Sequence, residues 1–375
     1  MKIPFNKPYL TGKEAHYLYQ AVLSGKISGN GLFTEKCHGF FQEKYGFKKC
    51  LLTTSCTDAL EMAAILLNIT EGDEVIAPSY TFVSTTNAFV LRGAKIVFAD
   101  STVSNPNIDP SSLEALITPK TKAIVVVHYA GIACDMGKIM KIAQRHHLFV
   151  VEDAAQAIDS YYKERPLGSI GHLAAFSFHE TKNIISGEGG MLVINDQQFA
   201  DRAEIIWEKG TNRSAFFRGE VDKYGWVDIG SSFLPSEIIA AFLYAQLENL
   251  TDIQTKRKEI WNLYYDNLKV LEEKGAIKLP FIPSFATNNA HMFYLVCNSL
   301  ADRTALINYL RSKEIHAVFH YLSLHKSPFY ASKHDGRELL NCDNFSECLV
   351  RLPFYYELSK TEQYSIIDET IEFFA

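Results

Sequence analysis

Three clusters of polar residues follow short apolar runs of the chain, and each has a composition that suits a different chemical task. In the first cluster, residues 177–183 (SFHETKN), Lys182 follows an apolar run and precedes the flexible glycine-rich run 186–190. A lone lysine is usually a solvated surface residue, but a lysine held beside a buried strand can lose its proton and form a Schiff base with an aldehyde. Lys182 is therefore a candidate nucleophile.

The second cluster, residues 152–156 (EDAAQ), follows the apolar residues 149–151 (FVV). An acidic residue at this place can simply cap a helix. The alternative is that Asp153 pairs with a protonated ring nitrogen, as an aspartate does with the pyridinium in enzymes that use pyridoxal 5′-phosphate (PLP).

The third cluster, residues 53–58 (TTSCTD), places small hydroxyl residues between an expected strand and an expected helix. Such residues are most often plain helix caps, but backbone N–H groups and the positive end of the helix dipole also make this turn a phosphate cradle. Enough chain separates Asp153 from Lys182 for a helix and a return strand that would bring both to one rim of a sheet. Together the clusters predict a PLP site, with a cradle, a pyridinium partner and an imine-forming amine.

Short apolar runs alternate with amphipathic stretches up to about residue 250, which predicts a mainly parallel sheet covered by helices. The expected strands are residues 50–54, 74–77, 95–99, 123–127, 149–151 and 174–178, and the expected helices are residues 58–67 and 136–147. Ligands of open parallel sheets bind beyond the carboxyl ends of the strands, which is where the three polar clusters lie.

The chain has 375 residues, too many for one ordinary core, so we expect a large domain and a smaller one. From residue 251 a long charged helix runs to Gly275, followed by short strands at 291–296 and 317–320 that alternate with helices. We therefore predict an α/β protein with a large PLP-binding domain, residues 1–250 including the N-terminal arm, and a smaller C-terminal α/β domain, residues 251–375.

The composition is that of a globular protein, with 47% hydrophobic residues, 21% charged residues and a net charge of −6. These values exclude a disordered chain or a collagen and provide no general attraction for nucleic acid or a membrane surface. The N-terminus lacks the apolar core of a signal peptide and no window resembles a membrane span, so we expect a soluble cytoplasmic protein. The seven cysteines form no CxxC pair, so we expect neither a disulfide framework nor a metal site.

Motifs spread over nearly the whole chain resemble the sugar aminotransferases of the DegT type, which are PLP-dependent transferases of fold type I. These motifs are SCTDAL (55–60), PSYTFVSTTNA (78–88), VHYAG (127–131), VVEDAAQA (150–157), FSFHETKN (176–183) and GEGG (187–190). Later motifs look most like the subgroup that makes dTDP-4-amino-4,6-dideoxygalactose from dTDP-4-keto-6-deoxyglucose, for enterobacterial common antigen and related surface polysaccharides. They are residues 209–237, AHMFY (290–294), VFHYLSLH (318–325) and RLPFYYELS (351–359).

The resemblance implies a role for each matching residue of the cofactor site. Lys182 matches the catalytic lysine that holds the cofactor covalently and moves a proton, Asp153 matches the partner of the ring nitrogen, and Gln156 lies near the ring hydroxyl. Phe82 falls at the aromatic position that stacks on the ring. The expected phosphate contacts are Ser55, Cys56 through its backbone N–H, and Ser177.

The resemblance also implies a sugar nucleotide cleft and a second subunit. The residues expected to line the cleft are Lys26, Ser28, Gly29, Asn30, His128, Tyr129, His179, His320 and His325. Histidines at strand ends are as often structural, so His320 and His325 have that alternative. Ser232 stands where many relatives carry an asparagine that reaches the phosphate in the neighbouring subunit. Because family members complete each site across a two-fold axis, we expect a homodimer with shared active sites.

The implied reaction is amino transfer from an amino acid donor, L-glutamate by resemblance, to C4 of dTDP-4-keto-6-deoxyglucose. One alternative keeps the fold but changes the sugar nucleotide, with another nucleotide or amination at C3. A dehydrating branch of the family carries histidine in place of the lysine, so Lys182 argues against that branch. A non-enzymatic PLP-binding regulator would need an appended domain, which we do not expect here.

Overall fold

A seven-stranded mixed sheet forms the centre of the larger part of the protein. The computed structural model describes residues 2–375. The strands of this sheet are Lys49–Thr53 (β1), Glu74–Pro78 (β2), Lys95–Ala99 (β3), Thr121–Val127 (β4), Phe149–Asp153 (β5), Leu173–Ser177 (β8) and Gly190–Ile194 (β9). Their order is β1-β9-β8-β5-β4-β2-β3, and β9 runs antiparallel to both of its neighbours while the pairs from β8 to β3 are parallel. The prediction of a mainly parallel sheet is confirmed.

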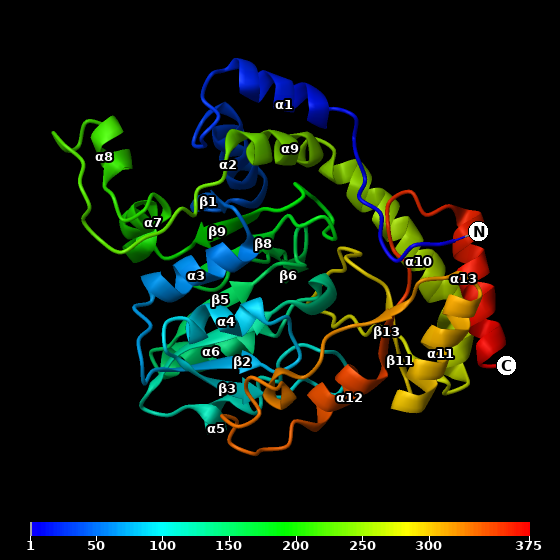
Figure 1. Ribbon diagram of the computed structural model, residues 1–375. Helices are drawn as coiled ribbons and strands as arrows, with labels where there is room; N and C mark the ends of the chain where they lie inside the picture. Colours follow the sequence, from blue (N-terminus) through cyan, green and yellow to red (C-terminus); the bar gives the residue numbers. More distant parts are fainter. Residues whose placement is uncertain (1) are drawn as a thin grey trace.

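Helices cover both faces of this sheet (Figure 1). The helices of this part of the chain are Glu14–Leu23 (α1), Leu32–Tyr45 (α2), Cys56–Leu66 (α3), Ser84–Val90 (α4), Leu113–Leu116 (α5), Met136–Arg145 (α6), Ala200–Trp207 (α7), Arg213–Phe217 (α8) and Glu237–Leu247 (α9). Successive strand residues point to opposite faces, so Val125 of β4 joins the apolar core under α3 and α7, and Val126 joins the core under α2, α6 and α9. The near-continuous apolar runs of the sequence follow from this burial on both faces.

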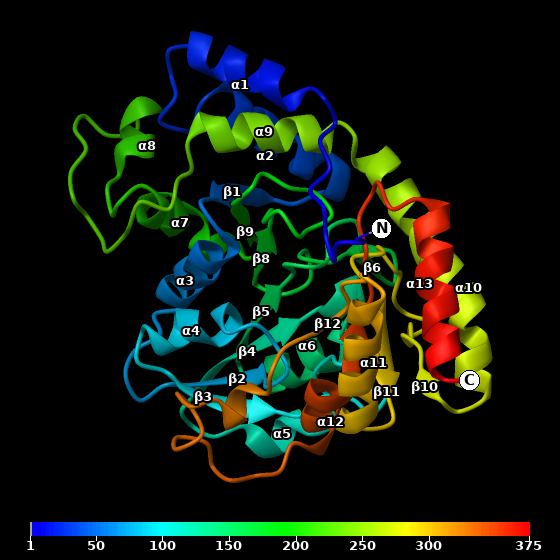
Figure 2. The same cartoon turned by 45° about the vertical axis from the view of Figure 1, so that its right-hand side comes forward.

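A four-stranded antiparallel sheet is formed by the C-terminal part of the chain. Its strands are Ile277–Lys278 (β10), Tyr294–Cys297 (β11), Val318–Phe319 (β12) and Leu349–Arg351 (β13), in the order β10-β11-β13-β12. The helices around it are Leu250–Glu273 (α10), Leu300–Ser312 (α11), Leu340–Cys348 (α12) and Lys360–Phe373 (α13) (Figure 2). The long helix α10 begins at the predicted boundary, and the division of the chain at residue 250 stays a prediction.

The N-terminal arm contacts the smaller sheet and its helices. Ile3 pairs with Ile315 in a parallel bridge, and the Phe5 carbonyl accepts a hydrogen bond from the Phe354 N–H at 3.1 Å. Ile3 belongs to the same apolar core as the residues of α10 and α13. The first residues of the chain therefore help to fix the position of the C-terminal part.

Two connections near the predicted site differ from the sequence-based expectation. Between β5 and β8 we expected a helix, but the chain forms a hairpin of two short strands, Tyr161–Tyr162 (β6) and Arg165–Pro166 (β7). The run 186–190, expected to be flexible, leads into a strand that the sequence analysis did not predict, because Gly190 is the first residue of the buried strand β9. The apolar residues that follow Gly190 are paired on both sides, with β1 and with β8.

No helix within residues 2–375 is long and apolar enough to cross a membrane. The same residues contain no group of three or more histidine, cysteine or acidic side chains placed to hold a metal ion.

Candidate active site

A cavity of about 390 Å³ lies at the carboxyl ends of β4, β5 and β8. It is the place at which open parallel sheets bind ligands. Seven of the eight residues predicted to contact the cofactor line it. They are Ser55, Cys56, Phe82, Asp153, Gln156, Ser177 and Lys182. The fold thus brings together the three polar clusters that the sequence places far apart.

Lys182 lies in the loop between β8 and β9, where its backbone N–H donates to the His179 carbonyl at 2.9 Å. Burial lowers the pKa of the Lys182 amine, Cys56 and Asp153 act against this shift, and the positive charge of Arg351 adds to it. The neutral amine is the form that attacks an aldehyde, so this environment favours Schiff-base chemistry at Lys182.

Asp153 is the last residue of β5, and its side chain is buried. Its carboxylate accepts hydrogen bonds from the Thr85 hydroxyl at 2.6 Å and from the Ala155 N–H at 3.1 Å. Burial raises the pKa of this carboxyl group, although both hydrogen bonds and the Lys182 charge oppose the shift. A buried carboxylate with one fixed orientation and no cation bonded to it is suited to bind a protonated ring nitrogen.

The start of α3 forms the phosphate cradle predicted from residues 53–58. Ser55 caps the helix, since its hydroxyl oxygen accepts the Asp58 N–H at 3.1 Å, and Cys56 and Thr57 form the first turn, whose N–H groups have no partner within the helix. Ser177, the last residue of β8, lines the same part of the cavity. Burial raises the pKa of the Cys56 thiol well above its usual value, which keeps it protonated and leaves its N–H as the group that can bind an anion.

Gly190 allows β9 to approach this cradle closely. A Cβ atom at this position would lie 2.3 Å from the carbonyl carbon of Ser55 and 2.4 Å from the Cys56 nitrogen. Only glycine permits such a contact between two backbones. The glycine-rich run therefore fixes the start of α3, and it also contributes Glu188 to the lining of the cavity.

The chain matches the DegT/DnrJ/EryC1/StrS aminotransferase family over residues 8–370. It is 33% identical to the spore coat polysaccharide biosynthesis protein SpsC of Bacillus subtilis, with 99% of this chain and 95% of SpsC aligned. It is 32% identical to the GDP-perosamine synthase of Escherichia coli O157:H7, over 100% of this chain and 99% of that protein. The chain belongs to the DegT/DnrJ/EryC1/StrS aminotransferase family.

Solved structures of aminotransferases have the same fold. The aminotransferase TlmJ from Streptoalloteichus hindustanus superposes with a TM-score of 0.92 at 26% identity, covering 100% of this chain and 99% of that one. The sugar aminotransferase Spr1654 from Streptococcus pneumoniae, in its pyridoxamine phosphate form, gives a TM-score of 0.91 at 25% identity, covering 99% of this chain and 98% of that one. This DegT-family chain is therefore a fold-type I aminotransferase with PLP as its cofactor.

The residues of the cavity fit PLP. The cradle at α3 suits the phosphate, the buried Asp153 suits the ring nitrogen, and Lys182 suits the aldehyde. Phe82 is 55% exposed at the mouth of the cavity, so one face of its ring is free to stack on the pyridine ring. Gln156 is held by the Ala130 N–H, which donates to its Oε1 at 2.6 Å, and its Nε2 donates to the Tyr321 hydroxyl at 3.2 Å.

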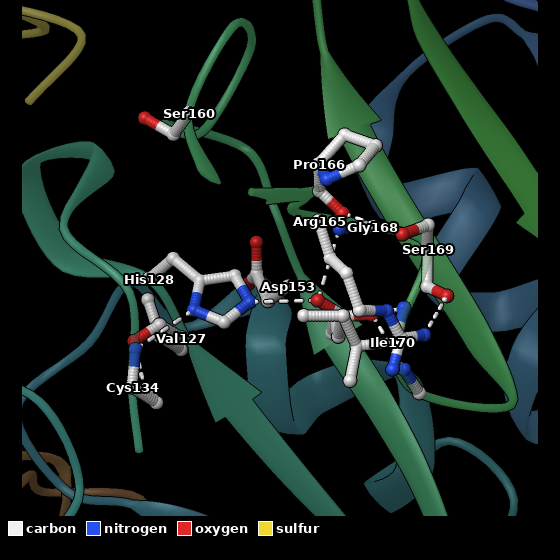
Figure 3. A network of polar contacts seen from close by, with 12 residues as sticks. Val127, His128, Cys134, Asp153, Ser160, Arg165, Pro166, Gly168, Ser169 and Ile170 are labelled. Carbon is white, nitrogen blue, oxygen red and sulfur yellow. Dashed lines mark hydrogen bonds and ion pairs between the residues drawn. The ribbon is translucent and has the colours of Figure 1, made fainter. Parts of the chain in front are cut away.

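His128 does not reach this cavity, contrary to the expectation that it lines the sugar cleft. Its side chain is fully buried, and Nδ1 accepts the Cys134 N–H at 3.2 Å (Figure 3). Its Nε2 lies 2.9 Å from the Glu152 carboxylate. Glu152 also accepts the N–H groups of Gly168, Ile170 and Gly171. Burial raises the pKa of Glu152, but these bonds outweigh it and the pKa is lowered. His128 is thus a structural residue beneath the strand end that carries Asp153.

The other expected substrate residues fall into three groups. His179 and His320 line the cavity. Tyr129 is buried behind it and donates or accepts a hydrogen bond with His320 Nδ1 at 2.7 Å. His325 does not line the cavity, because it is buried against the Ser79 hydroxyl, 2.7 Å from Nδ1, and near Asp343, so the structural alternative for His325 holds.

Lys26, Ser28, Gly29, Asn30 and Ser232 all lie outside the cavity of their own chain. The Ile27 carbonyl accepts the Glu237 N–H at 3.1 Å, and a Cβ atom at Gly29 would lie 2.1 Å from the Pro235 carbonyl oxygen. This loop is therefore packed on the segment that leads from Ser232 into α9. Lys26, Ser28 and Ser232 are exposed, Asn30 is half-buried and Gly29 is buried.

Nine polar residues that line the cavity were not assigned a role from the sequence. Four of them are Thr85, His291, Tyr321 and Arg351. His291 is buried, with Nδ1 2.7 Å from the Asn183 side-chain oxygen, and burial lowers its pKa well below the usual value. All four belong to motifs that carry the family resemblance. His291, Tyr321 and Arg351 come from the C-terminal part of the chain. A search for polar residues directly after the strands of the large sheet therefore could not identify them.

Proposed function

We propose that this chain transfers an amino group from L-glutamate to C4 of dTDP-4-keto-6-deoxy-D-glucose and so forms dTDP-4-amino-4,6-dideoxy-D-galactose. The observation that carries the proposal of amino transfer is one cavity that contains the Lys182 amine, with its lowered pKa, and the buried Asp153 carboxylate. The choice of sugar is supported by the motifs at 318–325 and 351–359, which resemble the subgroup that makes this product. The product is a precursor of a surface polysaccharide, a setting that the name of SpsC also indicates for that relative.

Each residue of the cavity has one task in this proposal. PLP supplies an aldehyde and a ring that accepts electrons from the bond broken at Cα. The Lys182 amine would hold the cofactor, and it would be the group that takes the Cα proton of the donor and delivers a proton to C4 of the sugar. Asp153 would keep the ring nitrogen protonated. Phe82 would pack on the ring face, and the first turn of α3 with Ser55 and Ser177 would hold the phosphate.

The protein is proposed to act as a homodimer in which each cavity is completed by the second copy. Ser232 and the loop 26–30 do not line the cavity of their own chain, and the loop is packed on the segment that follows Ser232. The adjoining segment with α8 projects from the body of the chain in both views (Figures 1 and 2). It exposes Phe217 and Trp226, and Trp226 is 85% exposed. An apolar surface of this kind is typical of a contact with another subunit.

A second acceptor is a GDP-linked 4-keto-6-deoxy sugar. It is favoured by the two relatives named GDP-perosamine synthase, from Escherichia coli O157:H7 and Caulobacter vibrioides, which are both 32% identical to this chain. The dTDP-linked and GDP-linked acceptors require the same cofactor chemistry, so only a measurement with each sugar nucleotide can distinguish them.

An absorption experiment on the holoenzyme tests both parts of the proposal. L-Glutamate is expected to bleach the visible band of bound PLP, and dTDP-4-keto-6-deoxyglucose is expected to restore it. Restoration by the GDP-linked sugar alone would establish the second acceptor. If L-glutamate leaves the band unchanged, the proposed donor is wrong, and a protein that takes up no PLP would exclude the assignment of the cavity.

A further inference from the structure

His291 is a buried residue of the cavity lining that lies just before β11. Its backbone N–H donates to the Asn289 side-chain oxygen at 3.0 Å, and its carbonyl accepts a hydrogen bond from Arg257 Nη2 at 2.6 Å. Its ring Nδ1 lies 2.7 Å from Asn183 Oδ1. Within residues 2–375, Nε2 of His291 has no hydrogen-bond partner. The protein therefore fixes this ring and leaves one of its nitrogens free for another contact.

The Asn183 amide decides which nitrogen of His291 carries the proton. Asn183 Nδ2 donates to the Asn289 carbonyl at 2.9 Å and to Gln254 Oε1 at 2.8 Å. A backbone carbonyl can only accept, so the atom of Asn183 that faces it is the nitrogen. The other atom, Oδ1, can also only accept, so the proton between it and His291 belongs to Nδ1. The neutral His291 ring therefore has a free lone pair on Nε2.

The surroundings of His291 keep its ring neutral. Burial lowers the pKa of the ring well below its usual value, and every titratable group that acts on it adds to this shift. These groups are Lys182 in the loop between β8 and β9, Arg351 in β13, Arg257 in α10 and His320 after β12. Lys182 has the largest effect among them. At neutral pH, Nε2 of His291 is therefore an acceptor and not a donor.

The other two histidines of the cavity are held differently. His179 Nδ1 accepts the Thr181 N–H at 3.2 Å, so the proton of the neutral ring is on Nε2. His320 Nδ1 lies 2.7 Å from the Tyr129 hydroxyl, which can donate or accept, so this contact does not fix the proton. Of the three rings, that of His291 is the one whose contacts set Nε2 as an acceptor.

Lys182 needs an acceptor at one stage of the proposed reaction. When its amine takes the Cα proton of the donor, it becomes an ammonium group with three N–H donors, and the electron pair of the broken bond goes to PLP. A buried cation without a partner is costly, and the Lys182 amine makes no hydrogen bond or ion pair with the residues that the structure describes. Asp153 is reserved for the ring nitrogen of PLP, and Glu188 faces solvent beside His179. The lone pair of His291 Nε2 is left for the ammonium group.

We propose that His291 accepts a hydrogen bond at Nε2 from the Lys182 ammonium group while that group carries the Cα proton, and that Asn183 is the positioning residue that holds His291 in the tautomer able to accept it. This inference rests on the proposed amino transfer. The proton stays on Lys182, and His291 remains neutral throughout. Because Asn183 directly follows Lys182 in the chain, one segment provides the amine and also sets its acceptor.

Two amide substitutions separate this role from a structural one, because each reproduces one nitrogen of the ring. The amide of His291→Asn falls at the place of Nδ1 and can keep the bond to Asn183, but it leaves nothing at the place of Nε2. The longer side chain of His291→Gln brings its amide oxygen to the place of Nε2 and gives up the bond to Asn183. The proposal thus favours glutamine, whereas a purely structural role would favour asparagine.

The pKa of Lys182 in the apoenzyme is a readout that does not depend on turnover. It is obtained from the pH dependence of the rate at which Lys182 is acetylated, followed by mass spectrometry of its peptide. His291→Asn is expected to lower this pKa by about 1 pH unit or more, because a hydrogen bond to a charged group is lost, and His291→Gln to change it by less than about 0.5. His325→Asn is the matched control and should match the wild type, since His325 is also buried with Nδ1 bonded to a side chain but does not line the cavity.

Single-turnover kinetics of the loaded enzyme test the proton transfer itself. With L-glutamate, His291→Asn should slow conversion of the PLP form by about 10-fold or more, and His291→Gln by less than about threefold. Deuterium at Cα of L-glutamate should slow the reaction of His291→Asn further. The proposal is overturned if the Lys182 pKa of His291→Asn equals that of the wild type, if His291→Gln loses as much as His291→Asn, or if His291→Asn is slow but insensitive to deuterium.

One measurement needs no variant to fold. In a neutron crystal structure of the wild-type apoenzyme exchanged into heavy water, we expect deuterium on Nδ1 of His291 and none on Nε2, and deuterium on Nε2 would overturn the proposal. Failure of the proposed function gives a different result. A wild-type enzyme that L-glutamate does not convert would overturn the proposed donor, whereas the position of the proton on His291 and the pKa of Lys182 are measured without any substrate.

Discussion

At the scale of single residues, the chemistry depends on the Lys182 amine, whose pKa is lowered by burial. Lys182→Ala is expected to give a folded protein that binds PLP without a covalent link. The measurement is borohydride reduction of the holoenzyme followed by mass spectrometry of its peptides, which should find the cofactor on Lys182 in the wild type and on no peptide of the variant. Lys163→Ala, at an exposed lysine, is the control and should be labelled like the wild type. A reduced cofactor on any other lysine would show that the assignment is wrong.

Asp153 acts on the cofactor through its charge, so a neutral isostere separates charge from shape. Asp153→Asn is expected to retain bound PLP, because the cradle at α3 is unchanged, and to lose about 100-fold or more in kcat. Steady-state kinetics and the cofactor content of the purified variant are the measurements. Near-normal turnover would mean that Asp153 does not pair with the protonated ring nitrogen.

The same substitution, Asp153→Asn, is expected to stabilise the apoenzyme. Burial raises the pKa of Asp153 in the folded protein above the value of 3.8 expected for the unfolded chain. The folded state therefore binds the proton more tightly than the unfolded state does. The free energy of unfolding falls as the pH rises from the unfolded-state pKa to the folded-state pKa, and it stays lower at higher pH. Asp153→Asn should raise the melting temperature of the apoenzyme at pH 7, and the difference should narrow as the pH is lowered toward about 4. An equal difference in melting temperature at pH 7 and at about pH 4 would show that the buried charge of Asp153 does not cause the effect.

At the scale of elements, the cradle depends on how closely β9 passes the start of α3. Gly190→Ala places a methyl group against the backbone of Ser55 and Cys56, so we expect α3 to shift. The expected cost is about 1–3 kcal/mol in the free energy of unfolding, together with weaker binding of PLP. Urea unfolding and PLP titration measure the two effects. Gly39→Ala in α2, where nothing lies within 4 Å of the new methyl group, is the control and should be neutral or stabilising by up to about 1 kcal/mol.

The elements also show which parts of the fold were predictable from the sequence. The expected strand at 95–99 has the boundaries of β3, and the expected helix at 136–147 overlaps α6, because apolar periodicity reports burial directly. The strand β9 was missed, since its glycine-rich start resembles a loop. A helix was expected where the β6–β7 hairpin lies, because the length of chain between Asp153 and Lys182 does not distinguish a helix from a hairpin.

At the scale of the whole molecule, the site is built from parts whose proximity no local pattern reports. Asp153 and Ser177 were predicted because each ends a strand of the large sheet. His291 and Arg351 reach the same cavity from the C-terminal part of the chain, so their motifs were recognised without their place in the site. His128 was expected to line the cleft because it follows a strand, but its ring points into the protein toward Glu152.

The shared dimer is a property of the whole assembly and is tested by complementation. Lys182→Ala lacks the amine of a cavity, and the double variant Lys26→Ala, Asn30→Ala lacks the side chains proposed to enter the cavity of the second copy. Each alone should be nearly inactive. In a two-fold dimer, one of the two cavities of a mixed pair carries both changes and the other carries neither. After unfolding and refolding of an equal mixture, about a quarter of the wild-type activity should therefore return, because half of the dimers are mixed and each has one intact cavity. If the mixture stays inactive while light scattering shows dimers, the loop acts in the cavity of its own chain and the sharing is wrong.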